Sequence, residues 1–134
     1  MESESSFFKP KAVRRVVSIQ TSRQVVEIMK HSVKTGTGGE AAIKGHEVAG
    51  KTGTAQKYDR ETGGYSTTAY VSSFVGFVPA HAAKIAILVM VDEPKGVHWG
   101  GSVAAPVFKN IERETLRYLN VPSSDQRVYI LDRA

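Results

Sequence analysis

The 134-residue sequence contains no cysteine, which excludes a disulfide framework, a thiolate metal site and a cysteine nucleophile. It also lacks a long hydrophobic run, because the longest strongly apolar stretch, residues 85–91, is far too short to cross a bilayer. Residues 1–11 contain no apolar signal segment and are expected to form a disordered leader or an engineered start. The chain itself is therefore expected to be soluble.

Acidic residues are scarce between residues 9 and 34, where Glu27 is the single acid beside seven lysines and arginines. Such an excess of positive charge is typical of surfaces that bind nucleic acids or membranes. Stacking aromatics are missing there, and the basic residues belong to two different elements, so we favour a solvated surface and expect no nucleic-acid partner. A non-catalytic basic binding module stays open as an alternative.

The apolar patterns that are present predict a single domain of mixed α/β (α+β) class. The expected elements are strands at 12–19, 69–78 and 84–91 and helices at 21–33 and 104–120. The linker PAHAA between the last two strands is too short for a crossover helix, so the sheet is expected to be antiparallel. Because residues 85–91 are apolar on both alternate faces, we expect this strand to be central, with helices covering both sides.

Capping and spacing signals define the two helices further. Thr21 and Gln24 fit a capping box, Gly36 is expected to end the first helix, and Pro106 is expected in the first turn of the second. The residues expected to face the core are Val25, Ile28, Met29 and Val33 in the first helix and Val107, Phe108, Ile111, Tyr118 and Leu119 in the second.

The stretch GHEVAGKTGTAQK, residues 45–57, satisfies two incompatible motifs. GHEVAGKT matches the phosphate-binding pattern of P-loop proteins, and the acidic strand end Asp92-Glu93 resembles the magnesium-holding acid of that class. A P-loop needs a strand before Gly45 and a helix from Lys51 or Thr52, and neither flank has the required pattern. The nucleotide-binding reading is therefore the weaker alternative.

Read as a strand, the same residues form a plausible binding surface. Alternation places Thr52 and Thr54 on one side, with Gly53 between them, so that a ligand could lie against the backbone. Lys51 adds a positive charge suited to a carboxylate.

Several segments in order resemble the C-terminal part of the transpeptidase domain of class B (monofunctional) penicillin-binding proteins of the cell-division type. They are VRRVVS with TSRQVVEIMKHSV, GTGGEAA, VAGKTGTAQK, SFVGFVPA, ILVMVDEP and GGSVAAPVFKNI, and they span residues 13–121. The resemblance implies a partial penicillin-binding, β-lactamase-like fold and the cross-linking of peptidoglycan stem peptides through a serine acyl-enzyme.

The resemblance also implies roles for the K-T-G residues. Lys51 would contact the serine of a second motif, Thr52 and Thr54 would hold the carboxylate of a substrate or β-lactam, and the Thr54 amide would form half of an oxyanion hole. Gly53 would permit close approach.

This sequence departs from the family pattern at two motifs. The S-x-N motif is absent, and the only S-x-x-K, Ser6 to Lys9, is followed by Pro10 and is read as coincidence. We therefore expect a fragment, with residues 12–121 as a transpeptidase subdomain and 122–134 as a tail or linker, that is inactive alone.

The expected partners are stem peptides and β-lactams in the full-length protein. Membrane contact would come only through a segment outside this sequence, with the domain in the periplasm. No cofactor or metal is expected, because His31, His46, His81 and His98 lack metal-binding spacing. Trp99 is expected to cap the core, and an uncovered sheet face is expected to make the fragment a homo-oligomer.

Overall fold

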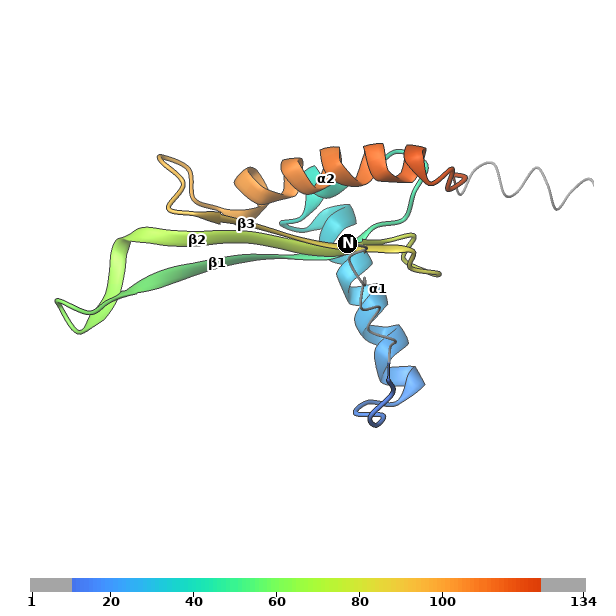
Figure 1. Cartoon of the computed structure of the whole chain (residues 1–134), viewed down its shortest axis with the longest axis horizontal. Helices are drawn as coiled ribbons and strands as arrows, with labels where there is room; N and C mark the ends of the chain where they lie inside the picture. Colours follow the sequence, from blue (N-terminus) through green and yellow to red (C-terminus); the bar gives the residue numbers. More distant parts are fainter. Residues whose placement is uncertain (1–10, 124–134) are drawn as a thin grey trace, which may run out of the picture.

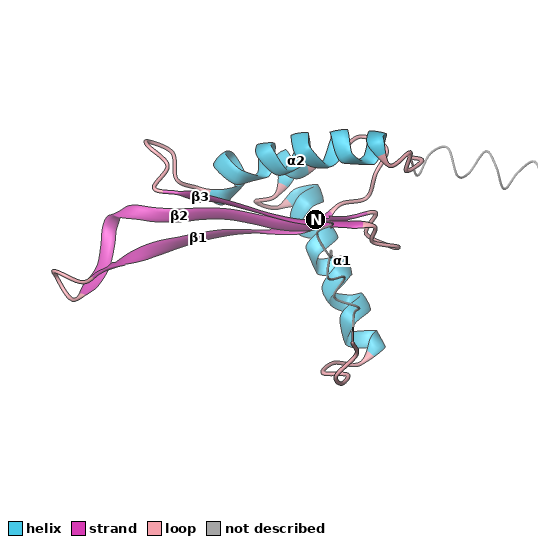
Figure 2. Cartoon of the chain, viewed as in Figure 1, coloured by secondary structure: helices cyan, strands magenta, loops and turns pink. Residues whose placement is uncertain are grey.

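The computed structural model describes residues 11–123 of the chain. It contains helix α1 (Ile19–Thr35), the short 3-10 helix η1 (Gly39–Ala41), strands β1 (Ala49–Asp59), β2 (Gly64–Val78) and β3 (Ile85–Asp92), and helix α2 (Gly100–Tyr118). The strands form one antiparallel sheet in the order β1-β2-β3, as Figures 1 and 2 show. The predicted mixed class and the antiparallel connection through PAHAA are confirmed.

The core lies between α2 and one face of the sheet. Phe74 and Val78 of β2 and Val89 of β3 are buried on this face, and the ring of Phe74 packs 4.8 Å from that of Phe108 on α2. Figure 1 shows α2 running along the sheet on this side, whereas α1 projects from the opposite side. Helix α2 therefore covers part of one face, and the far end of the β1–β2 hairpin extends beyond it (Figure 1).

The other face is apolar and exposed. Val75, Leu88 and Met90 keep 45%, 58% and 62% of their surface accessible. The prediction that a face would be bare is confirmed, but the central position of residues 85–91 is wrong, because β2 is central and β3 is an edge strand. The expectation that helices cover both sides of this strand is also wrong, because α2 covers one face and Leu88 and Met90 stay exposed on the other.

Residues 12–17 form no strand, which corrects the prediction for 12–19. A β-branched run becomes a strand only when a neighbouring strand supplies hydrogen bonds, and no described strand pairs with it. Helix α1 begins at Ile19, with Ser18 as its N-cap accepting a hydrogen bond from the Thr21 backbone N–H at 3.0 Å. Thr21 is therefore inside the helix, and the predicted end at Gly36 is confirmed.

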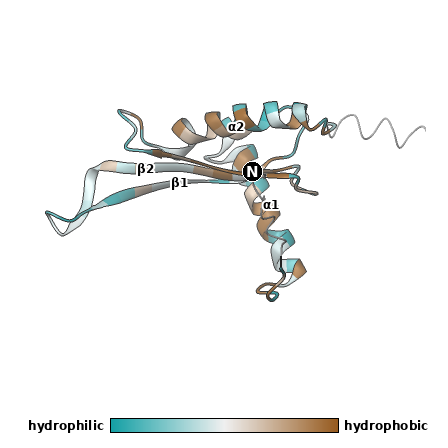
Figure 3. Ribbon diagram, viewed as in Figure 1, coloured by the Kyte–Doolittle hydropathy of each residue, from teal (hydrophilic) through white to brown (hydrophobic). Residues whose placement is uncertain are grey.

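Only the last part of α1 enters the core. Val33 is buried, whereas Val25 and Ile28 keep 48% and 68% of their surface accessible. Figure 3 shows hydrophobic segments on the part of α1 that projects below the sheet. Of the four residues predicted to face the core, Val33 is therefore buried, Met29 is half-buried, and the other two are exposed.

Helix α2 buries a different face from the predicted one. Its buried side chains are Ala104, Ala105, Phe108, Glu112 and Leu116, and of the residues predicted to face the core only Phe108 is buried. Small alanines allow the helix to approach the sheet closely, which a search for bulky apolar residues misses. Pro106 lies in the helix interior, because α2 begins at Gly100 and not at residue 104.

Candidate functional site at the edge of the sheet

The K-T-G residues lie on β1, at the free edge of the described sheet. Thr52 pairs with Phe74 and Thr54 with Ser72 of β2, so both threonines share the face that α2 covers. Thr52 is half-buried and Thr54 is exposed. The predicted alternation along this strand is confirmed.

Lys51 starts from the opposite face, because it pairs with the exposed Val75. Its Nζ donates to the Thr52 carbonyl oxygen at 2.9 Å and lies 3.4 Å from Thr52 Oγ1. The ammonium therefore lies beside the Thr52 hydroxyl, and the Thr52 carbonyl is accessible at the free edge. Since alternate residues direct their backbone groups to the same side of a strand, the Thr54 N–H is expected at this edge too.

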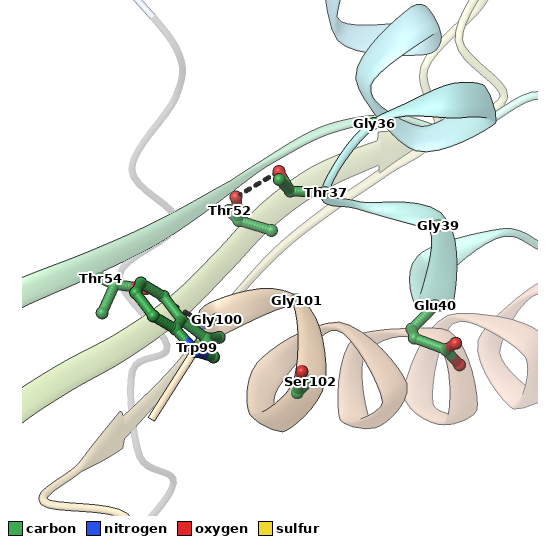
Figure 4. A pocket seen from close by; sticks show the side chains of 10 residues that line it. All are labelled: Gly36, Thr37, Gly39, Glu40, Thr52, Thr54, Trp99, Gly100, Gly101 and Ser102. Atoms are coloured by element: carbon green, nitrogen blue, oxygen red, sulfur yellow. Dashed lines mark hydrogen bonds between the residues drawn. The ribbon is translucent and has the colours of Figure 1, made fainter. Parts of the chain in front are cut away.

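Both threonine hydroxyls are held by neighbouring segments, as Figure 4 shows. Thr54 Oγ1 accepts a hydrogen bond from the Gly100 backbone N–H at 3.1 Å, and Thr52 Oγ1 lies 2.9 Å from Thr37 Oγ1. Because the Gly100 bond uses a lone pair of the Thr54 oxygen, the Thr54 hydroxyl proton stays available to an outside acceptor. Both threonine side chains are thus held in place, and the Thr54 hydroxyl can still donate a hydrogen bond to a ligand.

Two glycines make this arrangement possible. A Cβ at Gly100 would collide with the backbone oxygens of Ser73 and Gly53, so only glycine lets the start of α2 reach β1. A Cβ at Gly53 would lie 2.5 Å from Ser73 Oγ. Packing against Ser73 is therefore a reason for glycine at position 53 that does not depend on any ligand.

Thr52, Thr54 and Gly100 line a pocket of about 390 Å³ at the N-terminus of α2. Its lining comprises Gly36, Thr37, Gly39, Glu40, Thr52, Thr54, Trp99, Gly100, Gly101 and Ser102. The positive end of the α2 dipole and the nearby Lys51 favour an anion, while Glu40 opposes one on the far wall. The pocket is therefore suited to a carboxylate beside Thr52 and Thr54.

The structure contradicts the P-loop interpretation. Lys51 and Thr52 lie within the eleven-residue strand β1 and not at the start of a helix. The acidic pair at the end of β3 binds an ammonium, because Lys57 Nζ lies 3.0 Å from Asp92 Oδ1 and 2.6 Å from Glu93 Oε1. Hydrogen bonds to Glu93 and Asp92 raise the pKa of Lys57.

Trp99 does not cap the core, which corrects that prediction. It is 62% exposed at the N-cap of α2 and packs against His98, whose ring stacks on Tyr70 at 4.0 Å. Ser72 Oγ donates to the His98 carbonyl, which fixes this loop to β2. Trp99 therefore faces the pocket and solvent.

Sequence reasoning missed Thr37 and Ser102 as neighbours of the site. The glycines around Thr37 and before Ser102 were the available signal, since close backbone approach requires glycine. The S-x-x-K candidate, Ser6 to Lys9, lies outside the described residues. Within residues 11–123, no cluster of three or more metal-ligating side chains forms, and no helix has the length and apolarity needed to cross a membrane.

Comparison with known proteins identifies relatives of this arrangement. Residues 2–113 match the model of the penicillin binding protein transpeptidase domain. Stage V sporulation protein D of Bacillus subtilis is 42% identical over 113 residues, covering 84% of this chain and 17% of that protein. A peptidoglycan D,D-transpeptidase FtsI of Buchnera aphidicola is 36% identical over 110 residues, covering 81% of this chain and 19% of that protein. The chain thus spans less than a fifth of either relative.

Solved structures show the same architecture. The apo transpeptidase domain of penicillin-binding protein 3 from Burkholderia pseudomallei has a TM-score of 0.73 and 43% identity, over 83% of this chain and 34% of that one. Penicillin-binding protein 3 of Mycobacterium tuberculosis, complexed with ampicillin, has a TM-score of 0.74 and 36% identity, over 82% of this chain and 26% of that one.

Proposed function

Because the chain belongs to the penicillin-binding protein transpeptidase domain family, we propose that it supplies the K-T-G wall of a peptidoglycan D,D-transpeptidase site. The observation that carries the proposal is the pairing of oriented Thr52 and Thr54 hydroxyls with an ammonium and a helix N-terminus at one free strand edge. This set of donors suits the carboxylate of a stem peptide or a β-lactam.

In this proposal the nucleophilic serine comes from outside the described residues. The serine oxygen attacks the peptide carbonyl while its proton passes to a base in the same outside segment, and the Thr54 N–H stabilises the negative charge on the carbonyl oxygen as one oxyanion-hole donor. Collapse of this intermediate breaks the C–N bond, releases the protonated amine and leaves the acyl group on the serine. Lys51 faces the serine of a second motif, Thr52 and Thr54 hold the carboxylate, and Gly53 keeps the strand flat against the substrate.

The further partners and the location follow the same family. We propose that a longer protein carrying this sequence is anchored in the inner membrane with this domain in the periplasm. We also propose that the exposed face formed by Val75, Leu88 and Met90 drives self-association of this chain.

Acylation by a fluorescent penicillin tests the site assignment in a protein that joins this chain to a segment carrying the S-x-x-K and S-x-N motifs. Thr54→Pro removes the amide donor and should slow acylation about 10² to 10³-fold, equivalent to about 3 to 4 kcal/mol. Lys51→Ala should also slow it strongly, whereas Lys84→Ala, at an exposed turn position, should not. Parental acylation rates in folded Lys51→Ala and Thr54→Pro variants would contradict the proposal.

A further inference from the structure

A second pocket, of about 380 Å³, lies against the C-terminal half of α2. We call it the α2 basic pocket; its lining consists of Ile43, Lys44, His46, Lys109, Arg113, Leu116, Arg117 and Val121. It shares no lining residue with the pocket beside Thr52 and Thr54. The proposed transpeptidase chemistry does not use it.

Its rim carries positive charge from two segments. Helix α2 contributes Lys109, Arg113 and Arg117, each four residues after the last, so they form one stripe along the helix. The loop before β1 contributes Lys44. Among the residues that the structure describes, no carboxylate lines this pocket, so its potential favours an anionic ligand.

Glu114, on the same helix, competes with a ligand for two of these cations. Its carboxylate lies 3.2 Å from Arg113 Nε and 3.3 Å from Arg117 Nη1, and the Glu114 side chain is 58% exposed. Exposed ion pairs of this kind contribute little stability, so a ligand carboxylate can replace Glu114 at small cost.

The floor of the pocket is aliphatic. Ile43 and Leu116 are buried members of the hydrophobic core, and Val121 packs against that core. An inorganic anion gains nothing from such a floor, and the lining has no aromatic side chain on which a nucleobase could stack. A ligand that uses both features must combine acidic groups with aliphatic ones.

The spacing of the rim also favours a chain-like ligand. Four helical residues advance by about 6 Å along the axis, so the three cations of α2 extend over about 12 Å. Side chains on alternate residues of an extended peptide recur at about 6.5 to 7 Å. Carboxylates on such a peptide can therefore meet successive cations of the stripe.

We propose that the α2 basic pocket binds an extended acidic segment of a partner protein, with an aliphatic side chain of that segment on the Ile43–Leu116–Val121 floor. The pocket is then an interaction site separate from the K-T-G edge. Electrostatic attraction to the rim makes this binding sensitive to salt.

Fluorescence anisotropy tests the proposal on the full chain with a dye-labelled extended peptide. Two glutamates and a leucine between them occupy alternate residues of this peptide, so that all three side chains share one face. The double variant Arg113→Gln with Arg117→Gln should weaken binding about tenfold or more, because the ligand can then no longer pair with these two cations of the rim. Glu114→Gln should strengthen it by freeing both guanidinium groups. Lys84→Gln with Lys95→Gln, which removes the same two positive charges at exposed loop positions, should leave it unchanged.

Two further probes separate the ligand classes. A peptide with serine in place of leucine should bind more weakly, because it leaves the aliphatic floor uncovered. A single-stranded oligothymidine should compete poorly. Equal binding of the serine peptide, stronger binding of the oligonucleotide, or unchanged affinity in a folded double-arginine variant would each overturn the proposal.

Discussion

Glu112 carries a carboxyl group at a fully buried position of α2. Neither of its oxygens has a hydrogen-bond partner among residues 11–123, and desolvation raises the pKa of this carboxyl from 4.5 to about 7. Folding therefore favours the protonated form, and the unfolded chain releases the proton at lower pH. The contribution of this carboxyl to the free energy of unfolding is greatest below pH 4.5, where the group is protonated in both the folded and the unfolded chain. That contribution is lost as the pH rises toward 7, because the unfolded chain releases the proton first.

The pH dependence of stability tests this assignment. Glu112→Gln keeps the size of the side chain and removes its charge, so near pH 8 the variant should exceed the parent in free energy of unfolding by at most about 3 kcal/mol. Near pH 4.5 the two proteins should be almost equal. Urea unfolding at both pH values measures the difference. A gap that does not change with pH would show that Glu112 is not buried in neutral form.

Residue-level prediction from sequence succeeded where alternation decides the outcome. Thr52 and Thr54 share a face because side chains alternate in a strand, and this needed no tertiary information. Glu112 could not be predicted, because a glutamate normally marks the solvent side of a helix. Trp99 was misjudged for the converse reason, since a large aromatic residue was expected in the core.

At the level of elements, the contact between α2 and β1 holds the candidate site together. The Gly100 N–H reaches Thr54 only because the first turn of α2 lies against the backbone of Gly53 and Ser73. A side chain at position 100 would push the helix away from the strand. The orientation of the Thr54 hydroxyl therefore depends on one glycine of another element.

Gly100→Ala should lower the free energy of unfolding by about 1 to 3 kcal/mol, because the added methyl group overpacks this contact. Gly64→Ala is the matched control, since a Cβ there meets nothing within 4 Å. Chemical denaturation of both variants compares them directly. Equal stabilities would mean that α2 does not need to approach β1 this closely.

The sequence predicted which helices and strands form better than it predicted which strands pair and which helix face is buried. Residues 12–19 carry a strand pattern, yet the pattern contains no information on whether a neighbouring strand is available. Strand β2 begins at Gly64 rather than residue 69, because polar residues in a two-stranded hairpin lack an apolar alternation. The buried face of α2 depended on small residues next to the sheet.

At the level of the whole molecule, the main feature is the exposed apolar face of the sheet. Val75, Leu88 and Met90 lie on adjacent strands on the side away from α2, with Val75 directly paired to Leu88. A surface of this kind on a monomer favours association with another copy. The proposed self-association follows from the packing of one helix layer on a sheet.

Sedimentation equilibrium at micromolar concentration tests self-association. The parent chain should show a concentration-dependent mass above that of a monomer. Leu88→Lys combined with Met90→Lys should shift it to a monomer, because two charges on the face resist desolvation. Lys95→Leu, with one substitution outside the face, should not. A parent chain that stays monomeric would refute this proposal.

The central claim is that the edge residues Thr52 to Thr54 recognise a carboxylate. Amide chemical-shift mapping of the isotope-labelled full chain, titrated with ampicillin and separately with its methyl ester, tests it most directly. Since oriented hydroxyls and an ammonium attract a carboxylate, ampicillin should shift the amides of Thr52, Gly53, Thr54 and Gly100, and the ester should shift them much less. Equal shifts with both compounds, or shifts confined to residues away from this edge, would contradict the account.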